Sequence, residues 1–193
     1  MFSWFFVISL VIILTISQTA WEMEPMVEES LMLIASILIG IGAVGRIWCA
    51  VYISGRKDSV LVKTGPYSLC RNPLYFFSLL GGIGVGLATE TFTIPLLILL
   101  AFVLYYPAVI LAEERRLADI FGEEYKIYQK ETPSFFPKWN LFGFNEPDTY
   151  SINPQKVRSA CLDVLWFIWL IGIIEFVSAC HEAKILPTLI FLL

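Results

Sequence analysis

Long apolar segments with few charged residues dominate this chain, and they restrict its fold more than any other feature. The segments are Phe2–Ala20, Leu31–Ile53, Leu74–Thr89, Thr91–Ala112 and Cys161–Ala179. Most approach the roughly 20 residues that an α-helix needs to cross a bilayer. Hydrophobic residues make up 58% of the chain and charged residues 16%, against roughly 45–50% and about 25% in soluble domains. We therefore predict an all-α, polytopic membrane helix bundle with about five transmembrane helices.

The two ends of the chain are also apolar. No Lys or Arg precedes Phe2–Ala20, and this segment is longer than the roughly 7–15 residues of a signal-peptide core, so we expect a retained helix. The last nine residues, ILPTLIFLL, would reach only ~14 Å as a helix. We expect this tail to dock against the bundle or to extend along the membrane surface. Residues 1–193 are interpreted as a single membrane domain.

Basic residues predict the orientation of the spans. All of the 13 Lys and Arg residues except Arg46 and Lys184 lie between the second and third spans or between the fourth and fifth. The loop on the opposite side, WEMEPMVEES, has no basic residue. Because cytoplasmic loops are enriched in Lys and Arg, we expect both basic regions and the N-terminus to face the cytoplasm.

An amphipathic pattern begins where the fourth span ends, at Glu113. Apolar and aromatic residues recur there every three or four positions, at Leu117, Ile120, Phe121, Tyr125 and Tyr128. This spacing predicts an amphipathic helix that continues the fourth span into the cytoplasm, weakened in its middle by a glycine. A plain solvated helix resting on the headgroups would show the same pattern.

Several functional classes find little support in the sequence. The net charge of −4 provides no basic field for nucleic acid. The four cysteines are scattered without a CxxC motif, and His181 is the only histidine, so neither a metal site nor a disulfide framework is expected. The stretch Gly40–Gly45 matches GxGxxG, but it lies inside an apolar span with no preceding strand. There, and at Gly82 and Gly86, small residues are expected to let helices pack closely.

Polar residues near the ends of the spans are better candidates for a site. Arg46 lies seven residues before the end of the second span, where it either reaches the interface or faces the bundle and binds an anionic group. Asn72-Pro73 is typical of a helix start, with Asn72 as the capping residue. Glu113 and Glu114 are adjacent carboxylates that repel each other unless cations are near.

Four motifs follow one another in a characteristic order. They are Gly65-Pro66-Tyr67, Arg71-Asn72-Pro73-x-Tyr75, Glu113-Glu114 and Phe121-Gly122-x-Glu124-Tyr125-x-x-Tyr128. Together they resemble the isoprenylcysteine carboxyl methyltransferase family, a group of integral-membrane enzymes that includes relatives of phospholipid methyltransferases. The resemblance covers about residues 45–137, so the fifth span at 161–179 and the tail lie outside it. Asn72 stands where many relatives carry His, and an Asn can donate a hydrogen bond but cannot titrate.

The resemblance implies S-adenosylmethionine as the cofactor, bound at the cytoplasmic membrane face. A sulfonium cation is attracted to aromatic faces, and the motifs supply Tyr67, Tyr75, Tyr125 and Tyr128. Arg71, next to Asn72 and Pro73, is expected to hold the carboxylate of the methyl donor in a bidentate pair. Glu113 or Glu114 is expected to bind the ammonium group or the ribose hydroxyls.

The expected function is transfer of a methyl group to a lipophilic acceptor, either a small molecule or a lipidated substrate that enters from the membrane lipids. Carboxyl O-methylation needs no base, because a carboxylate is already nucleophilic at neutral pH; Arg46 would orient this acidic group. N-methylation of a phospholipid or another amine is an alternative in which a glutamate, with Glu114 as the candidate, accepts the proton. A non-catalytic membrane interaction protein is an alternative of another class.

Overall fold

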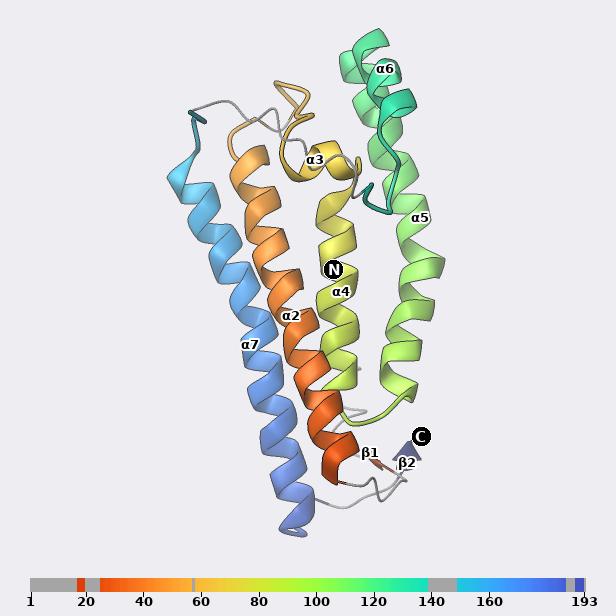
Figure 1. Cartoon of the computed structure of the whole chain (residues 1–193), viewed down its shortest axis with the longest axis vertical. Coiled ribbons are helices and arrows are strands. Elements are labelled where there is room, and N and C mark those ends of the chain that lie inside the picture. The colour runs from red at the N-terminus through yellow and green to blue at the C-terminus, as the bar shows by residue number, and fades with distance from the viewer. Residues whose placement is uncertain (1–16, 20–24, 57, 139–148, 187–189, 193) are drawn as a thin grey trace.

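A computed structural model describes residues 17–19, 25–56, 58–138, 149–186 and 190–192 of the chain. The described residues form helices, apart from turns, loops and two three-residue strands (Figure 1). The helices are α2 (Pro25–Ile53), α3 (Pro66–Leu69), α4 (Pro73–Leu87), α5 (Thr93–Phe121), α6 (Glu123–Glu131) and α7 (Pro154–Glu182). The strands are β1 (Ser17–Thr19) and β2 (Ile190–Leu192). The predicted helical class is confirmed, whereas the strands were not expected.

Within the described ranges, three helices, α2, α5 and α7, are long and apolar enough to cross a membrane. The third expected span is α4, whose 15 residues reach about 22 Å and fall short of the roughly 30 Å hydrocarbon core. The first expected span, Phe2–Ala20, lies outside the described residues except for Ser17–Thr19. Those three residues form β1, so the expectation that the helix continues to Ala20 is wrong. The total of five spans stays a prediction.

Glycines allow α2 and α4 to approach each other closely. A Cβ added at Gly42 would lie 2.7 Å from the backbone of Gly81, and one at Gly45 would overlap the ring of Phe77. These contacts confirm that the glycines of the second span pack helices together. Gly40, in contrast, faces open space and takes no part in this contact.

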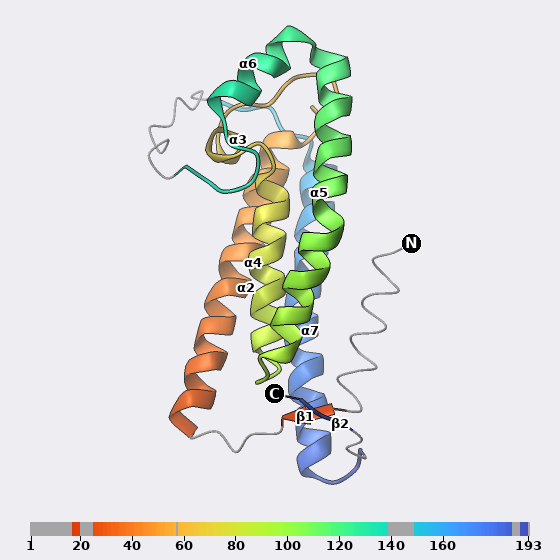
Figure 2. The same cartoon turned by 90° about the vertical axis from the view of Figure 1, so that its right-hand side faces the viewer.

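The hairpin of α4 and α5 positions the functional part of the molecule. α4 packs against α2, and α5 packs on the other side of α4 (Figure 1). An apolar core that includes Ile39, Val85 and Ile94 joins the three helices at the end near the turn. Because α5 has 29 residues and α4 has 15, the second half of α5 rises beyond the start of α4 (Figure 2). The glutamates at 113 and 114 are thereby raised to the level of the loop before α4.

The expected amphipathic helix is divided in two. α5 continues the fourth span as far as Phe121, but Gly122 has φ +56°, a conformation that favours glycine. The chain turns there, and α6 folds back over the end of the bundle near α3 (Figure 2). The turn converts one predicted helix into two and brings the residues after α6 down onto the start of α4.

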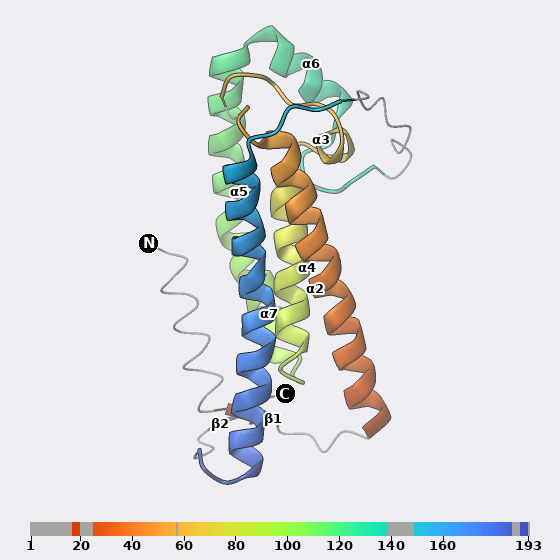
Figure 3. The same ribbon diagram turned by 90° about the vertical axis from the view of Figure 1, so that its left-hand side faces the viewer.

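The opposite end of the bundle joins the two termini of the described chain. β1 and β2 are parallel, with Ser17 paired to Ile190 and Thr19 to Leu192. Part of the apolar tail therefore extends along β1, whereas its expected course along the membrane surface stays a prediction. Figure 3 shows these strands near the far end of α7, well away from α3 and α6.

Candidate active site

Two polar segments that are distant in sequence meet at the α3–α6 end of the bundle (Figure 1). The first runs from the end of α2 to the start of α4, and the second from the last turns of α5 through the loop after α6. They are joined by a set of hydrogen bonds that we call the polar cluster. Its members are Arg71, Asn72, Glu114, Gln129, Thr132 and Ser134. The two segments belong to the two basic regions that were expected on one side of the membrane, and they do lie at one end of the bundle. That this end faces the cytoplasm stays a prediction.

Arg71 and Glu114 form the centre of the polar cluster. The Nε and Nη2 atoms of Arg71 each donate to a carboxylate oxygen of Glu114 at 3.0 Å. Both side chains are largely buried, with 12% and 11% of their surface exposed. Parallel bonds of this kind fix the orientation of both groups as well as their distance.

The remaining donors of Arg71 bind the end of α6. Nη1 donates to the carbonyl oxygens of Gln129 at 2.9 Å and Thr132 at 2.6 Å. Gln129 lies in the last turn of α6 and Thr132 is the residue that caps this helix, so both carbonyls lack intrahelical partners. Four of the five guanidinium N–H groups are thus used within the protein.

Glu114 receives hydrogen bonds from several groups besides Arg71. The Nδ2 atom of Asn72 donates to it at 3.0 Å, and the hydroxyl of Ser134 donates at 2.8 Å. Nδ2 of Asn72 also donates to the carbonyl oxygen of Ser134 at 3.1 Å. Asn72 does occupy the capping position of α4, but its side chain makes no capping hydrogen bond. That part of the prediction is wrong, because the amide is directed to Glu114 instead.

The four expected tyrosines fall into two groups, of which the first comprises Tyr67, Tyr125 and Tyr128. All three are buried, and the hydroxyl of Tyr128 donates to the carbonyl oxygen of Tyr67 at 2.6 Å. The hydroxyl of Tyr125 is buried and has no hydrogen-bond partner among the described residues. Burial, followed by the nearby negative charge of Glu114, raises the pKa of Tyr125 to about 12. Its hydroxyl is therefore a neutral donor at physiological pH.

Tyr75 belongs instead to an aromatic cluster with Phe76, Phe102, Tyr106 and Phe135. Its ring lies 5.2 Å from that of Tyr106, which is stacked on Phe102 at 4.1 Å. Phe135 contacts Phe76 and Phe102 and thereby brings the loop after α6 onto both helices of the hairpin. Glu113 is an electrostatic neighbour of Tyr75. Glu113 is also more exposed than Glu114, with 31% of its side-chain surface accessible.

Arg46 faces the interior of the bundle. Its Nη1 atom donates to the hydroxyl of Ser78 on α4, whereas Nε is buried and has no partner among the described residues. Tyr106 of α5 is an electrostatic neighbour of Arg46. The guanidinium thus lies among α2, α4 and α5, on the membrane side of the polar cluster.

Comparison with known proteins identifies the family. The profile of the phospholipid methyltransferase family matches residues 25–124, which include the Arg71, Asn72 and Glu114 of the polar cluster. The chain belongs to the phospholipid methyltransferase family. Membership confirms the expected relationship to the integral-membrane methyltransferases, and the three long apolar helices agree with a membrane protein.

Two curated relatives of this phospholipid methyltransferase family member carry names of another kind. One is the nickel-cobalt-cadmium resistance protein NccN of Alcaligenes xylosoxydans xylosoxydans, 37% identical over 98% of this chain and 87% of its own length. The other is the cobalt-zinc-cadmium resistance protein CzcN of Cupriavidus metallidurans, 39% identical over 86% of this chain and 76% of its own length. No solved structure matches the chain.

The described ranges contain no group of three or more His, Cys, Asp or Glu residues placed to hold a metal ion. The cysteines at 49, 70, 161 and 180 are free thiols.

Several members of the site were missed in the sequence. Gln129, Thr132 and Ser134 follow the last recognised motif and gave no pattern of their own. Tyr106 lay inside an apolar span. The sequence did contain an indication that Tyr106 lies near Tyr75. The two residues are the same number of positions from the turn at Glu90–Thr91. Such positions lie at the same level in two antiparallel helices, because both helices rise equally per residue.

Proposed function

We propose that the protein transfers a methyl group from S-adenosylmethionine to the carboxyl group of a lipophilic acceptor at the cytoplasmic face of a membrane. The observation that carries this proposal is the bidentate pair of Arg71 and Glu114, which joins two family motifs at one end of the membrane-spanning helices. A surface of aromatic rings and a partly exposed carboxylate lie next to this pair.

The residues beside the polar cluster fit the methyl donor. Its chemistry is that of an electrophilic methyl group on a cationic sulfur. Tyr75 and Tyr106 offer aromatic faces to such a cation, an attraction of about 0.5–2 kcal/mol. Glu113 would bind the ammonium group or a ribose hydroxyl of the methyl donor. The hydroxyl of Tyr125, which has no partner among the described residues, would donate a hydrogen bond to an oxygen or nitrogen of the same molecule.

Arg71 and Glu114 are assigned here as positioning residues. Four of the N–H groups of Arg71 are used by protein contacts, and the hydroxyl of Tyr125 lies beside the guanidinium, so a bidentate grip on a second carboxylate would require Arg71 to release Glu114. Glu114 is held by the charge of Arg71 and by the donors of Asn72 and Ser134, and this environment opposes protonation. Methyl transfer depends on alignment more than on proton transfer, so rigid support of α4, α5 and α6 is what the reaction requires.

Arg46 is proposed to orient the acceptor. Its buried Nε lacks a partner among the described residues, and a cation at membrane depth is costly unless it is paired. A carboxylate on a lipophilic molecule would pair with it after entering laterally from the bilayer. The Arg46→Ala variant should then have a raised KM for the methyl acceptor in turnover measurements. An unchanged KM would show that Arg46 does not orient the acceptor.

N-methylation of an amine lipid is the second candidate, and the family description favours it. A protonated amine must lose its proton before attack. Glu113 is better placed than Glu114 to accept this proton, because more of its side chain is exposed.

The names of the curated relatives suggest a cellular context. We propose that the methylated product contributes to resistance to nickel, cobalt, zinc or cadmium. The test uses a bacterium from which the related gene has been deleted. The wild-type chain or the Glu113→Gln variant is introduced, and growth in the presence of these metals is measured. Resistance restored by the wild type alone supports an enzymatic role, and equal restoration by both supports the non-catalytic alternative.

The acceptor can be found directly. Membranes containing the protein are incubated with methyl-labelled donor and then extracted into lipid, soluble and protein fractions. Base-labile label in a lipophilic product is expected for an ester, and base-stable label indicates methylamine. Absence of any label that depends on the protein would contradict the proposed activity.

A further inference from the structure

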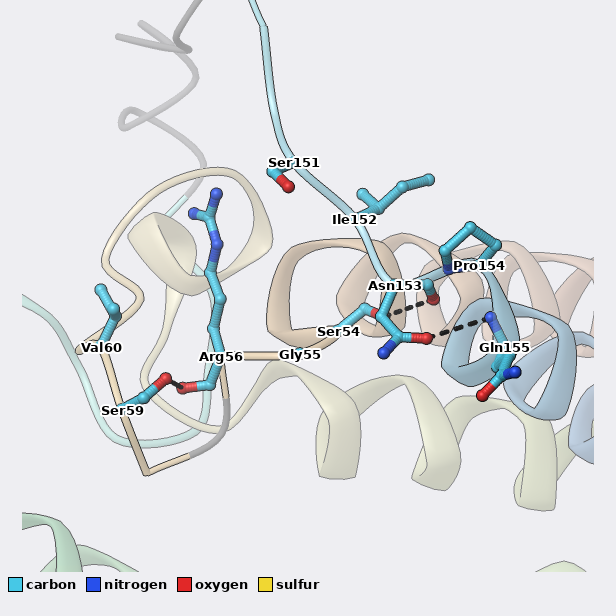
Figure 4. A pocket seen from close by; sticks show the side chains of 10 residues that line it. All are labelled: Ser54, Gly55, Arg56, Ser59, Val60, Ser151, Ile152, Asn153, Pro154 and Gln155. Carbon is cyan, nitrogen blue, oxygen red and sulfur yellow. Dashed lines mark hydrogen bonds between the residues drawn. The ribbon is translucent and has the colours of Figure 1, made fainter.

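A cavity that is open to solvent and lined by several polar residues lies at the same end of the bundle, but beside α2 and α7 instead of α4 and α5. Its volume is about 730 Å³, and Figure 4 shows its lining. The described lining residues are Ser54, Gly55, Arg56, Ser59, Val60, Ser151, Ile152, Asn153, Pro154 and Gln155. The polar cluster contributes none of them, so this space is separate from the candidate methyltransferase site.

Arg56 gives the cavity a positive charge. Its guanidinium lies over the ring of Tyr150, with Cζ 3.6 Å from the ring centroid, an arrangement that leaves the N–H edge open to a ligand. No ion pair to Arg56 occurs within the described part of the chain, and no carboxylate is present among the described lining residues. The charge of the cavity is therefore uncompensated by its own walls.

The other lining groups are neutral hydrogen-bonding side chains held in place by local structure. The hydroxyl of Ser54 donates to the carbonyl oxygen of Asn153 at 2.9 Å. The Oδ1 atom of Asn153 accepts from the backbone N–H groups of Gln155 and Lys156 and so caps α7. These bonds fix the end of α2 against the start of α7, and the walls of the cavity are thus built independently of any ligand.

The position of the cavity indicates where its ligand comes from. The candidate membrane span α2 ends at the wall of the cavity, and the candidate span α7 begins there. The cavity therefore lies at the level of lipid headgroups. Basic pockets between membrane helices on one face of a bilayer bind anionic headgroups. Guanidinium groups match phosphate oxygens in geometry.

We propose that this cavity binds a phosphate-bearing anion, either the headgroup of an anionic phospholipid or a soluble phosphomonoester. The site holds the anion between the guanidinium of Arg56 and the hydroxyl and amide groups of the opposite wall. It needs no methyl donor and stands apart from the proposed methyl transfer.

The test uses the full chain in detergent and native mass spectrometry. The probes are phosphatidylglycerol, with phosphatidylcholine as the zwitterionic reference, and glycerol 3-phosphate as the soluble competitor. Wild type should retain phosphatidylglycerol in preference to phosphatidylcholine, and Arg56→Gln should lower that retention about tenfold, the effect of losing one hydrogen bond to a charged group. Lys130→Gln removes an exposed cation from α6 and should leave retention unchanged.

A second variant protects the test against misfolding of Arg56→Gln, which also loses the stacking on Tyr150. Gln155→Glu places a carboxylate in the wall while favouring the first turn of α7, so it should fold normally yet repel the anion. Displacement of the lipid by glycerol 3-phosphate would identify a soluble phosphomonoester as the ligand, and resistance to displacement would identify the lipid headgroup. Equal retention of phosphatidylglycerol by wild type, Arg56→Gln and Gln155→Glu would overturn the proposal, as would binding of neither probe.

Discussion

Arg71 and Glu114 join the start of α4 to α5 through two 3.0 Å hydrogen bonds, although 43 residues separate them in the sequence. The same guanidinium holds the last carbonyls of α6. Three helices thus depend on one ion pair that is largely withdrawn from water. The exposed pair of Lys63 and Glu124 spans the same two segments, but exposed pairs of this kind contribute only about 0–1 kcal/mol.

Removal of Arg71 is expected to destabilise the fold. Arg71→Gln leaves the carboxylate of Glu114 buried without its cation, and such a loss costs about 3–5 kcal/mol. Denaturation in detergent, followed by circular dichroism, measures the change. Arg115→Gln is the matched control, because Arg115 follows Glu114 in the sequence and is exposed. This substitution should alter the free energy of unfolding by less than about 0.5 kcal/mol. Equal effects of the two substitutions would show that the pair does not support the fold.

Substitutions of two neighbouring tyrosines should separate effects on stability from effects on binding of the methyl donor. Tyr128→Phe removes the hydroxyl that donates to the carbonyl of Tyr67 and should cost about 1–3 kcal/mol of stability. Tyr125→Phe removes a buried hydroxyl with no partner among the described residues and should leave stability unchanged or slightly improved. If Tyr125 contacts the donor, the same variant should bind S-adenosylmethionine less tightly in calorimetry. A loss of stability without any loss of donor affinity in Tyr125→Phe would reverse this assignment.

Two glycines of α2 form another matched pair. In Gly42→Ala the new methyl group would meet the backbone of Gly81 at 2.7 Å, and overpacking of this kind typically costs about 1–3 kcal/mol. Gly40→Ala faces open space and should gain up to about 1 kcal/mol, because alanine favours the helix. Thermal denaturation of both variants in one detergent compares them. Similar melting temperatures would mean that α2 and α4 are farther apart than described.

Asn72→His should introduce a pH dependence that the wild type lacks at this position. Asn72 lies 3.0 Å from a carboxylate oxygen of Glu114, so an imidazolium there would be stabilised and its folded pKa raised above the usual value of about 6.5. The added stability is then fully present below that value and is lost as the pH rises through the raised pKa. Denaturation midpoints of both proteins between about pH 5 and pH 8.5 would reveal it. A constant difference over this range would argue against contact between residue 72 and Glu114.

The main features of the fold follow from hydrophobic segments, because segments as long and apolar as Leu31–Ile53 have few alternatives to a membrane helix. The position of the Arg71 and Glu114 segments at one end of the bundle also followed from the sequence, since a hairpin returns the chain to the face where it began. The direct ion pair between the two side chains was not predicted. The close approach of α2 and α4 at Gly42 was indicated by the small residues of the span.

The remaining features depend on long-range contacts that leave no local pattern. Gly122 predicted a weak helix, but its positive φ, and the docking of Thr132 and Ser134 on Asn72 that follows from it, are decided by the tertiary structure. The pairing of β1 with β2 joins residues from opposite ends of the chain, and neither three-residue segment has a strand pattern of its own. Asn72 was expected to cap α4 because the sequence does not show that a carboxylate lies within reach of its amide.

The surface beside Arg71 and Glu114 is expected to bind S-adenosylmethionine. Equilibrium binding of labelled donor to the purified full chain, with S-adenosylhomocysteine as competitor, measures this directly. We predict saturable, competable binding that weakens in Glu113→Gln and Tyr106→Ala but not in Lys130→Gln. Absence of saturable binding to a correctly folded wild-type protein would contradict the account.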